Sequence, residues 1–400
     1  MLKIAIITGT RAEFGIFRPV LAAIRAHPAL HLQLIVTGMH LLKHFGHTID
    51  DIRAAKIPIA ATVPMYKESR RSGHWTLDTR GGGHSSPAAS LARATAGLAA
   101  AYRQLRPDII LVLGDRLEIL AAATAALAEQ IPIAHLHGGE TAPGQWDEQI
   151  RHAVTKLAHL HFCATKTSAR RLRQMGEDPK TIHVTGAPAL DLAIPGCHAV
   201  TSAARVGMHA GLSQSHCTAS PLLILHPSSP DAALEYRRTL LILHTLRKHF
   251  PTPIRAIGPN NDPGHQGILR AYRASRPHVD LAMSLTQDQY WNLLARSGLL
   301  VGNSSSGIIE AASFGVPVIN IGPRQTGRER SPNVIDINFS ARALSAAIRR
   351  VSSDKPFQRR VARRQNVYGT GHASAKIAAI LARLATHPIS PIKQFHDLHL

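Results

Sequence analysis

Aromatic residues and cysteines are scarce in this sequence of 400 residues. Phe, Trp and Tyr make up only 4% of the chain, which is poor material for the stacking platforms that hold single-stranded nucleic acid. The cysteines Cys163, Cys197 and Cys217 form no CxxC pair and no evident disulfide framework, which fits a reducing cytoplasm.

Long apolar runs are missing as well. The apolar run at the N-terminus is too short for a signal peptide. No segment approaches the roughly 18 apolar residues that a membrane span needs. We therefore expect a soluble, cytoplasmic protein without a membrane partner.

Several motifs of nucleotide and metal chemistry are absent. The sequence has no GxxxxGK(S/T) and no GxGxxG after its first apolar run, which argues against ATPases and dinucleotide-dependent dehydrogenases. HExxH is missing, and so is the GxSxG of α/β-hydrolases. The pairs His135/His137 and His159/His161 have a spacing that metal ligands can have. Alternate residues of any strand share one face, however, so this spacing alone does not indicate a metal site. We expect neither a metal nor a cofactor.

Acidic residues are few relative to basic ones, because 46 Lys and Arg stand against 25 Asp and Glu, for a formal charge of +21. Such a balance suggests an acidic partner: nucleic acid, an anionic membrane or a phosphorylated substrate. The basic residues are spread along the chain and are densest in Ile348–Arg364. A small anionic substrate needs only a few of them, so the total charge alone does not decide between these partners. No aromatic residues are interleaved with the basic ones, and we expect no nucleic-acid partner. A non-catalytic nucleic-acid-binding protein is the alternative, and it predicts steeply salt-dependent binding.

Strand and helix signals alternate, which predicts βαβ units and parallel sheets. We expect an α/β fold of two Rossmann-like domains facing across a cleft, with a C-terminal helical tail from Ala341 to Thr386. Residues 1–190 form the first domain, 191–220 a linker, and 221–400 the second domain with the tail. A polar, Gly-rich insert, Lys67–Ser86, is either disordered or a lid. The predicted strands are Lys3–Thr8, His31–Thr37, Ile109–Leu113, Ile131–Ala134, Leu160–Ala164, Ile182–Thr185, Leu222–His226, Pro253–Ile257, Gly298–Val301 and Val316–Ile321.

Titratable side chains follow the apolar runs of the first half. Asp115 comes after the strand Ile109–Leu113, and a loop after the next strand holds His135, His137, Glu140 and Asp147. The carboxyl ends of parallel strands form the edge where open α/β sheets bind ligands, so this grouping suggests acid–base catalysis. The alternative is that Asp115 and Asp147 only cap the helices that follow them.

The second half has a Ser-rich junction between a strand and a helix, Gly302–Gly307, followed by Glu310. Small residues let a ligand approach the backbone, and Ser hydroxyls with free N–H groups can hold a phosphate. An ordinary Ser N-cap is the alternative. Arg324 or Arg328 could contact a diphosphate, Arg11 lies at a strand-to-helix turn, and His226 could contact a pyrophosphate or transfer a proton.

Longer segments resemble the UDP-N-acetylglucosamine 2-epimerases, specifically the hydrolysing branch that serves sialic acid and legionaminic acid biosynthesis. The segments occur in the family's order and cover most of Ile4–Asp336. They are ITGTRAEFG, VTGMHLLKHFGHTIDDI, LGDRLEILAAATAALAE, IPIAHLHGGET, DEQIRHAVTKLAHLHF, VTGAPALD, ILHPSSPD and GNSSSGIIEAASFGVPVINIGPRQTGRE.

The resemblance implies a GT-B-like pair of domains and a UDP-sugar substrate, and we expect a homo-oligomer, a dimer or a tetramer. It implies elimination of UDP through a 2-acetamidoglucal and addition of water to give N-acetylmannosamine. Asp115 and Asp147 match the family's acid–base carboxylates. His137 stands where non-hydrolysing relatives have a catalytic Glu, so Glu140 is the expected substitute, with His226 as a further candidate. The predicted UDP contacts are Arg11, Arg116, His226, Asn260, Ser304, Ser305, Ser306, Gly307, Glu310 and Arg324.

Two alternative activities stay open at this point. A glycosyltransferase of the same architecture would transfer the sugar to an acceptor. A related hydrolysing 2-epimerase would act on a modified UDP- or GDP-linked amino sugar.

Overall fold

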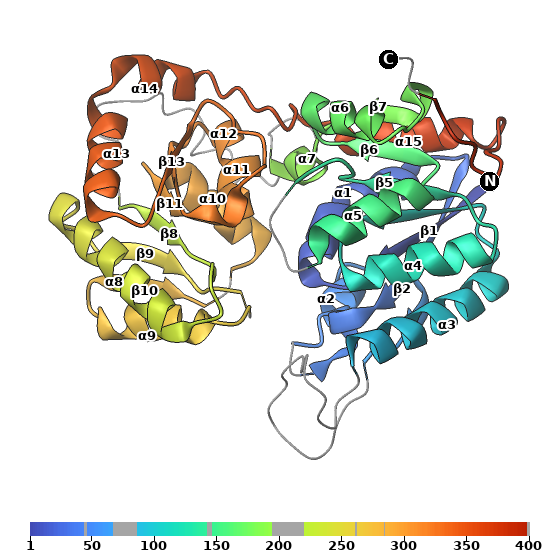
Figure 1. Cartoon of the computed structure of the whole chain (residues 1–400), viewed down its shortest axis with the longest axis horizontal. Coiled ribbons are helices and arrows are strands. Elements are labelled where there is room, and N and C mark those ends of the chain that lie inside the picture. Colours follow the sequence, from blue (N-terminus) through green and yellow to red (C-terminus); the bar gives the residue numbers. More distant parts are fainter. Residues whose placement is uncertain are drawn as a thin grey trace. The chain divides into compact units, whose positions relative to one another are not determined.

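The computed structural model describes residues 1–43, 46–66, 86–141, 146–193, 220–260, 262–283 and 285–397. The chain divides into two compact units. The first consists of Met1–Glu140, Gly144–Ala189 and His372–Leu400, and the second of Thr141–Pro143 and Leu190–Gly371. Each unit is a parallel sheet covered by helices, so the predicted α/β class is confirmed (Figure 1).

The first unit is built on a seven-stranded parallel sheet with the order β3-β2-β1-β4-β5-β6-β7. Its central strands are almost continuously buried apolar runs, as expected for strands covered on both faces. The strands are β1 (Leu2–Thr8), β2 (Leu30–Thr37), β3 (Ile59–Val63), β4 (Ile109–Leu113), β5 (Ile133–Leu136), β6 (Leu160–Cys163) and β7 (Ile182–Val184).

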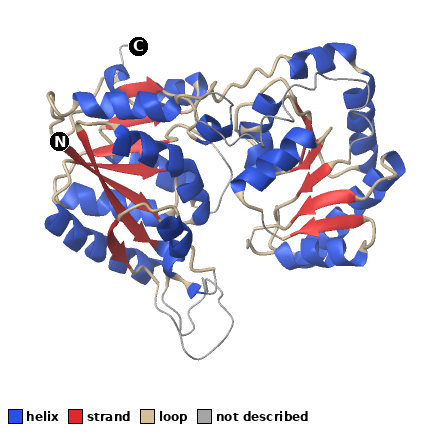
Figure 2. Cartoon of the chain, turned by 180° about the vertical axis from the view of Figure 1, so that it is seen from behind, coloured by secondary structure: helices blue, strands red, loops and turns tan. Residues whose placement is uncertain are grey.

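Helices cover both faces of this sheet (Figure 2). Alternate residues of β1 divide between the two faces: Ile4 and Ile6 join one buried cluster, and Ala5 and Ile7 join the other. The helices of the unit are α1 (Arg11–Ala26), α2 (Ile49–Ala54), α3 (Pro87–Leu105), α4 (Leu117–Ala128), α5 (Asp147–Leu157), α6 (Lys166–Gln174) and α15 (Ala373–Arg383), with 3₁₀ turns at Gly38–Leu41 and Pro179–Thr181. The short helix α7 (Ala189–Ala193) begins at the last residue of this stretch of the first unit, and its other residues belong to the second unit.

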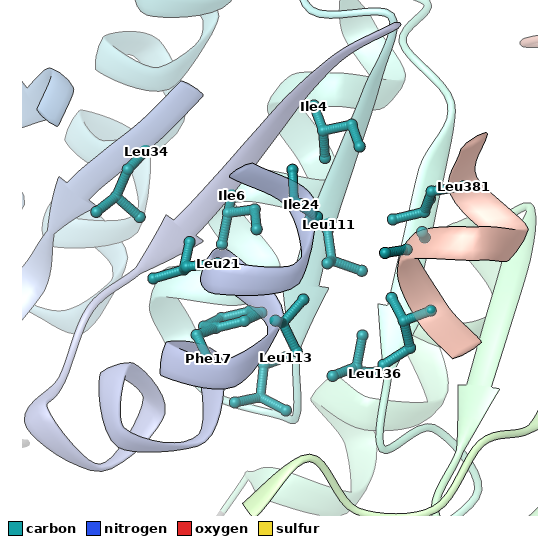
Figure 3. Close-up of a cluster of buried hydrophobic side chains, with 14 of the residues drawn as sticks. Ile4, Ile6, Phe17, Leu21, Ile24, Leu34, Leu111, Leu113, Leu136 and Leu381 are labelled. Atoms are coloured by element: carbon teal, nitrogen blue, oxygen red, sulfur yellow. The ribbon is translucent and has the colours of Figure 1, made fainter. Parts of the chain in front are cut away.

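The last helix, α15, packs on the first sheet although the sequence placed it in the second domain. Ile377 and Leu381 are fully buried in one cluster with residues of α1 and β1, and Figure 3 shows Leu381 on α15 at the edge of this cluster. Burial of such side chains stabilises a fold by about 1.5–3 kcal/mol each, which explains this position. The predicted boundary therefore differs from the structure from His372 onward.

The second unit has a six-stranded parallel sheet with the order β10-β9-β8-β11-β12-β13. α8, α9 and α13 cover one face, and α10 and α12 the other. Its strands are β8 (Leu222–Ile224), β9 (Ile254–Ile257), β10 (Val279–Ala282), β11 (Leu300–Gly302), β12 (Val318–Ile321) and β13 (Val334–Ile337). Its helices are α8 (Ala232–His249), α9 (His265–Ala274), α10 (Gln287–Arg296), α11 (Ser305–Ile309), α12 (Ala311–Phe314), α13 (Ala341–Ser353) and α14 (Lys355–Ala362), with a 3₁₀ turn at Pro323–Gln325.

The C-terminal tail is not continuously helical. After α14 the chain runs without a helix until α15, and Gly369 and Gly371 in this stretch have φ angles of +116° and +88°. Most of the Lys67–Ser86 insert and of the 191–220 linker lies outside the described residues, as do Cys197 and Cys217. Among the helices that are described, none is long and apolar enough to cross a membrane.

Candidate active-site residues in the two units

Both sheets have a point where the strand order reverses. In the first sheet it lies between β1 and β4, and in the second between β8 and β11. Loops leaving the carboxyl ends of such strands diverge and leave room for a ligand. Most of the predicted site residues lie on these loops or on the loops next to them.

Asp115 follows β4 and faces a buried arginine. Its Oδ2 forms a close ion pair with Nη2 of Arg151, whose side chain is only 3% exposed. Arg151 Nη1 also donates to the Glu140 carbonyl (2.9 Å) and to Glu148 Oε1 (3.3 Å). Arg151 thus joins the loops after β4 and β5 to helix α5. Asp115 is not a helix cap, because the N-cap of α4 is Arg116, so that alternative is wrong.

His137 and Glu140 form a second pair in the loop after β5. His137 Nδ1 lies 2.5 Å from Glu140 Oε1, and both residues are buried. The His137 backbone has a φ of +62°, an uncommon conformation for a residue with a side chain, and its N–H donates to the Phe162 carbonyl (3.0 Å). Because β5 ends in this turn, the His137 imidazole points toward Glu140 in the same loop.

His135 does not belong to this loop. It is a fully buried residue of β5, and its Nε2 lies 2.8 Å from the Gly114 carbonyl. Burial lowers the pKa of His135 to about 3, so the ring is neutral. Its position fits a structural role: it holds the turn that carries Asp115.

Asp147 is the first residue of α5 and is half-buried, while the N-cap of that helix is Trp146. Burial opposes a rise in the pKa of Arg116, but the charges of Glu118 and Glu13, with a smaller contribution from Asp147, raise it. Arg11, the first residue of α1, is about half exposed, and its Nε lies 3.6 Å from Asp51 Oδ2. Both residues are therefore at the carboxyl edge of the first sheet.

A cluster that the sequence did not single out surrounds Arg116. Arg116 Nε lies 3.4 Å from Oε2 of Glu118, a side chain that is 1% exposed. A second buried carboxylate, Glu13, accepts hydrogen bonds from the N–H groups of Gly9 (2.7 Å) and Thr10 (3.1 Å). Burial above all, with the Glu118 charge adding to it, raises the pKa of Glu13 to about 7.

In the second unit, Asn303 connects the ends of β8 and β11. Its Oδ1 accepts from the His226 N–H (2.7 Å), and its Nδ2 donates to the His226 carbonyl (2.8 Å) and to Ser228 Oγ (3.1 Å). Gly302 precedes it with a φ of +145°, and a Cβ there would lie 1.9 Å from the Ile224 carbonyl oxygen. Only glycine lets β11 turn so close to β8.

The His226 ring is held in one tautomer. Its Nδ1 accepts the backbone N–H of Asn260 (3.0 Å), so the proton of the neutral ring is on Nε2. Burial, with the Arg324 charge, lowers the pKa of His226 to about 4. At neutral pH this side chain is therefore a hydrogen-bond donor through Nε2.

Asn260 and Arg324 share a partner in this unit. Asn260 Nδ2 lies 2.6 Å from Asp262 Oδ2, and Arg324 Nη2 lies 3.1 Å from the same oxygen. The loops after β9 and β12 thus meet beside His226. This cluster combines donors and a cation at the carboxyl edge of the sheet, which is the chemistry that binds phosphate groups.

The Ser-rich junction has the predicted form. Ser304 is the N-cap of α11, and its Oγ accepts from the Ser306 N–H (3.4 Å) and lies 3.0 Å from Ser306 Oγ. Ser304, Ser305 and Ser306 are half-buried, and a Cβ on Gly307 would come within 2.9 Å of Leu300 Cδ2. The N-cap alternative is therefore realised, and it does not conflict with ligand binding by the same hydroxyls.

Glu310 follows α11 and accepts a hydrogen bond from Trp291 Nε1 (2.9 Å) through Oε2. Burial raises its pKa to about 7. One oxygen is thus engaged by the indole, and the second can accept from a ligand hydroxyl.

Four side chains of the site were given no role from the sequence: Glu13, Glu118, Arg151 and Asn303. Three of them had a local signal. Arg151 follows Asp147 by four residues and so shares its helix face, Thr10 and Glu13 have the spacing of a capping box, and Asn303 lies within the Ser-rich junction. Glu118 depends on contacts between distant loops. Within the part of the chain that is described, no group of three or more His, Cys, Asp or Glu residues is arranged to hold a metal ion.

The fold is that of two-domain GT-B-like proteins. A crystal structure of UDP-GlcNAc 2-epimerase from Neisseria meningitidis bound to UDP-GlcNAc matches with a TM-score of 0.76 at 19% identity, over 96% of this chain and 100% of that one. At such identity the likeness concerns the fold.

The chain belongs to the UDP-N-acetylglucosamine 2-epimerase family, whose sequence pattern matches residues 22–382. It is 35% identical to the UDP-N,N'-diacetylbacillosamine 2-epimerase (hydrolyzing) of Legionella pneumophila, over 96% of this chain and 97% of that protein. It is 32% identical to the UDP-N-acetylglucosamine 2-epimerase of Neisseria meningitidis over the whole of both chains. The family resemblance inferred from the motifs is confirmed.

Proposed function

We propose that this enzyme is a hydrolysing 2-epimerase that converts UDP-N-acetylglucosamine to N-acetylmannosamine and UDP. The observation that carries the proposal is the arrangement around Arg151, which binds the Asp115 carboxylate and the main chain of Glu140, while the Glu140 side chain pairs with His137. Two proton-carrying groups are thereby fixed at one sheet edge. Inversion at a carbon next to the anomeric centre requires removal of one proton and return of another.

The reaction has two steps that balance in atoms. A base removes the C2 proton and the C1–O bond to UDP breaks, which leaves a 2-acetamidoglucal. Water then adds its oxygen to C1, and C2 receives a proton from the opposite face of the ring. The product is free N-acetylmannosamine.

Asp115 is the proposed base for C2, because the Arg151 guanidinium stabilises the ionised carboxylate that accepts a proton. The His137–Glu140 pair is the proposed group that positions water and carries its proton. Asp147, on the first turn of α5, is the proposed further acid–base carboxylate.

Each unit carries residues that are proposed to contact the nucleotide. In the second unit, His226 Nε2–H and Arg324 suit the diphosphate, and the hydroxyls of Ser304, Ser305 and Ser306, with the backbone at Gly307, suit phosphate or ribose oxygens. The tautomer of His226 favours phosphate binding over proton abstraction. Asn260 and Glu310 complete the proposed contacts of the second unit, and Arg11 and Arg116 are the proposed contacts of the first.

A modified sugar is the second candidate substrate. The Legionella pneumophila relative, which is named for UDP-N,N'-diacetylbacillosamine, is slightly more similar to this chain than the Neisseria meningitidis relative. The two substrates differ at C4 and C6, far from the chemistry at C1 and C2, so the same residues would catalyse either reaction.

Proton NMR of the purified protein with UDP-N-acetylglucosamine in D2O tests the proposal. We expect UDP and free N-acetylmannosamine with one deuterium at C2. UDP-N-acetylmannosamine without free sugar would refute hydrolysis, and sugar transfer to an acceptor without deuterium at C2 would indicate a glycosyltransferase. A parallel reaction with UDP-N,N'-diacetylbacillosamine identifies the preferred substrate from the ratio of kcat/KM values.

A further inference from the structure

Glu118 lies on the first turn of α4, yet its side chain is turned away from solvent. Its pocket is formed by the loops that leave β1, β2 and β3. Tyr66 Oη donates to Glu118 Oε1 (3.2 Å), and added Cβ atoms on Gly9 and Gly38 would lie 2.8 Å from its Cγ and Oε1, respectively. The carboxyl ends of the central strands are thus shaped around this carboxylate.

Glu13 supplies a second buried carboxyl group in the same place. Its Oε2 is held by two backbone N–H groups, and its Oε1, like Glu118 Oε2, is buried without a hydrogen-bond partner among the described residues. Ion pairs of this kind contribute little to stability, because desolvation of the charges opposes their attraction. Glu13 also has a structural role, because it completes the capping box of α1 with Thr10. For Glu118, which makes no such cap, a purely structural reason is therefore weak.

Arg116 is the cation that these carboxylates face. Its Nε is buried against Glu118, whereas 41% of its side chain is exposed. One end of the guanidinium is anchored and the rest of the side chain is accessible to a ligand. An arginine held in this way loses less conformational freedom when it binds a phosphate than one that moves freely in solvent.

We propose that Glu118 is a positioning residue: through Arg116 Nε, and supported by Glu13, it fixes the Arg116 guanidinium for the diphosphate of the substrate. This inference rests on the proposed function, which makes Arg116 a contact of the UDP group. It adds a role for two buried carboxylates that do not touch substrate themselves.

A double-mutant cycle tests the coupling, with calorimetry of UDP and of uridine binding to wild type, Arg116→Ala, Glu118→Gln and the double variant. We expect each single substitution to weaken UDP binding about tenfold, the effect of one charge-assisted hydrogen bond, and to leave uridine binding unchanged. Glu118→Gln should add nothing once Arg116 is replaced, because it acts through that residue. In turnover, KM for the UDP-sugar should rise about tenfold while kcat changes much less.

Two further variants keep the test decisive if Glu118→Gln folds poorly. Arg116→Lys keeps the charge but cannot keep both the Glu118 contact and a phosphate contact, so it should lose nearly as much UDP affinity as Arg116→Ala. Glu177→Gln is the matched control, since Glu177 is also a buried carboxylate of the first unit, paired with His161 (3.0 Å) and Lys156 (2.7 Å). It should lower stability and leave UDP affinity unchanged.

The outcomes separate the inference from the proposed function. Additive effects of Glu118→Gln and Arg116→Ala, or wild-type UDP affinity in Arg116→Lys, would overturn the positioning role. Wild-type UDP affinity in Arg116→Ala would instead remove Arg116 from the nucleotide site and refute that part of the proposed function.

Discussion

Replacement of Asp115 by Asn tests the centre of the proposed mechanism. Asn has the same shape, so it can still accept a hydrogen bond from Arg151, but it is no longer a base. Turnover should fall by at least about 100-fold, the usual contribution of an acid–base group. UDP affinity should change little, because the nucleotide contacts assigned to the second unit are untouched.

The same substitution has a structural effect that must be measured separately. Arg151 is buried and loses a charged partner, but it keeps the Glu140 carbonyl and Glu148. We expect a loss of about 1–3 kcal/mol in the free energy of unfolding, the scale of a weakened buried hydrogen bond. Urea denaturation followed by circular dichroism gives this value, and single-turnover kinetics on the folded fraction gives the chemical rate.

Glu148→Gln is the control for an indirect effect through Arg151. It removes the other ion pair of Arg151, which has an Nη1–Oε1 distance of 3.3 Å, on a residue without an assigned proton-transfer role. Its stability loss should be similar or smaller, and its turnover should stay within about threefold of wild type. Near wild-type turnover in folded Asp115→Asn would refute the role of Asp115 as a base. An equal loss of turnover in both variants would show that Arg151 geometry, and not the Asp115 base, limits the reaction.

Three further predictions concern the second unit and the absence of a metal. Replacing Ser304 and Ser305 by Ala should weaken UDP binding by about 1–3 kcal/mol, and unchanged affinity in calorimetry would place the nucleotide elsewhere. Exhaustive EDTA treatment should leave turnover in place, whereas a loss that one divalent ion restores would contradict metal independence. Because the pKa of Glu310 is raised from 4.5 to about 7, the protonated form favours folding, and this contribution is present below pH 4.5 and lost as the pH rises through 7. Glu310→Gln keeps an acceptor for Trp291 but cannot titrate, so the free energy of unfolding should vary with pH by about 1–2 kcal/mol less in this variant than in wild type. The same pH dependence of unfolding in both proteins would refute the raised pKa of Glu310.

The central strands and the order of the units followed from the sequence alone. Apolar runs such as Ile109–Leu113 are long enough and uniform enough to specify buried parallel strands. The edge strands β3, β10 and β13 were missed, because a half-exposed strand lacks such a run. Helix α3 was missed as well, since its first residues follow the polar insert.

For the candidate site as well, part of the arrangement followed from the local sequence and part only from tertiary contacts. The local sequence determined that Asp115, His137, Glu140 and the Ser304 junction come directly after strands, and a parallel sheet brings such positions to one edge. Their partners came from tertiary structure alone: Arg151 is 36 residues from Asp115 along the chain, and Asn303 is 77 residues from His226. Side-chain pairing across such separations depends on which loops the fold brings together. The spacing of apolar residues along the sequence contains no information about these pairs. The position of α15 was mispredicted for the same reason. Its apolar face indicated that the helix is buried, but only the tertiary structure shows that it packs on the first sheet.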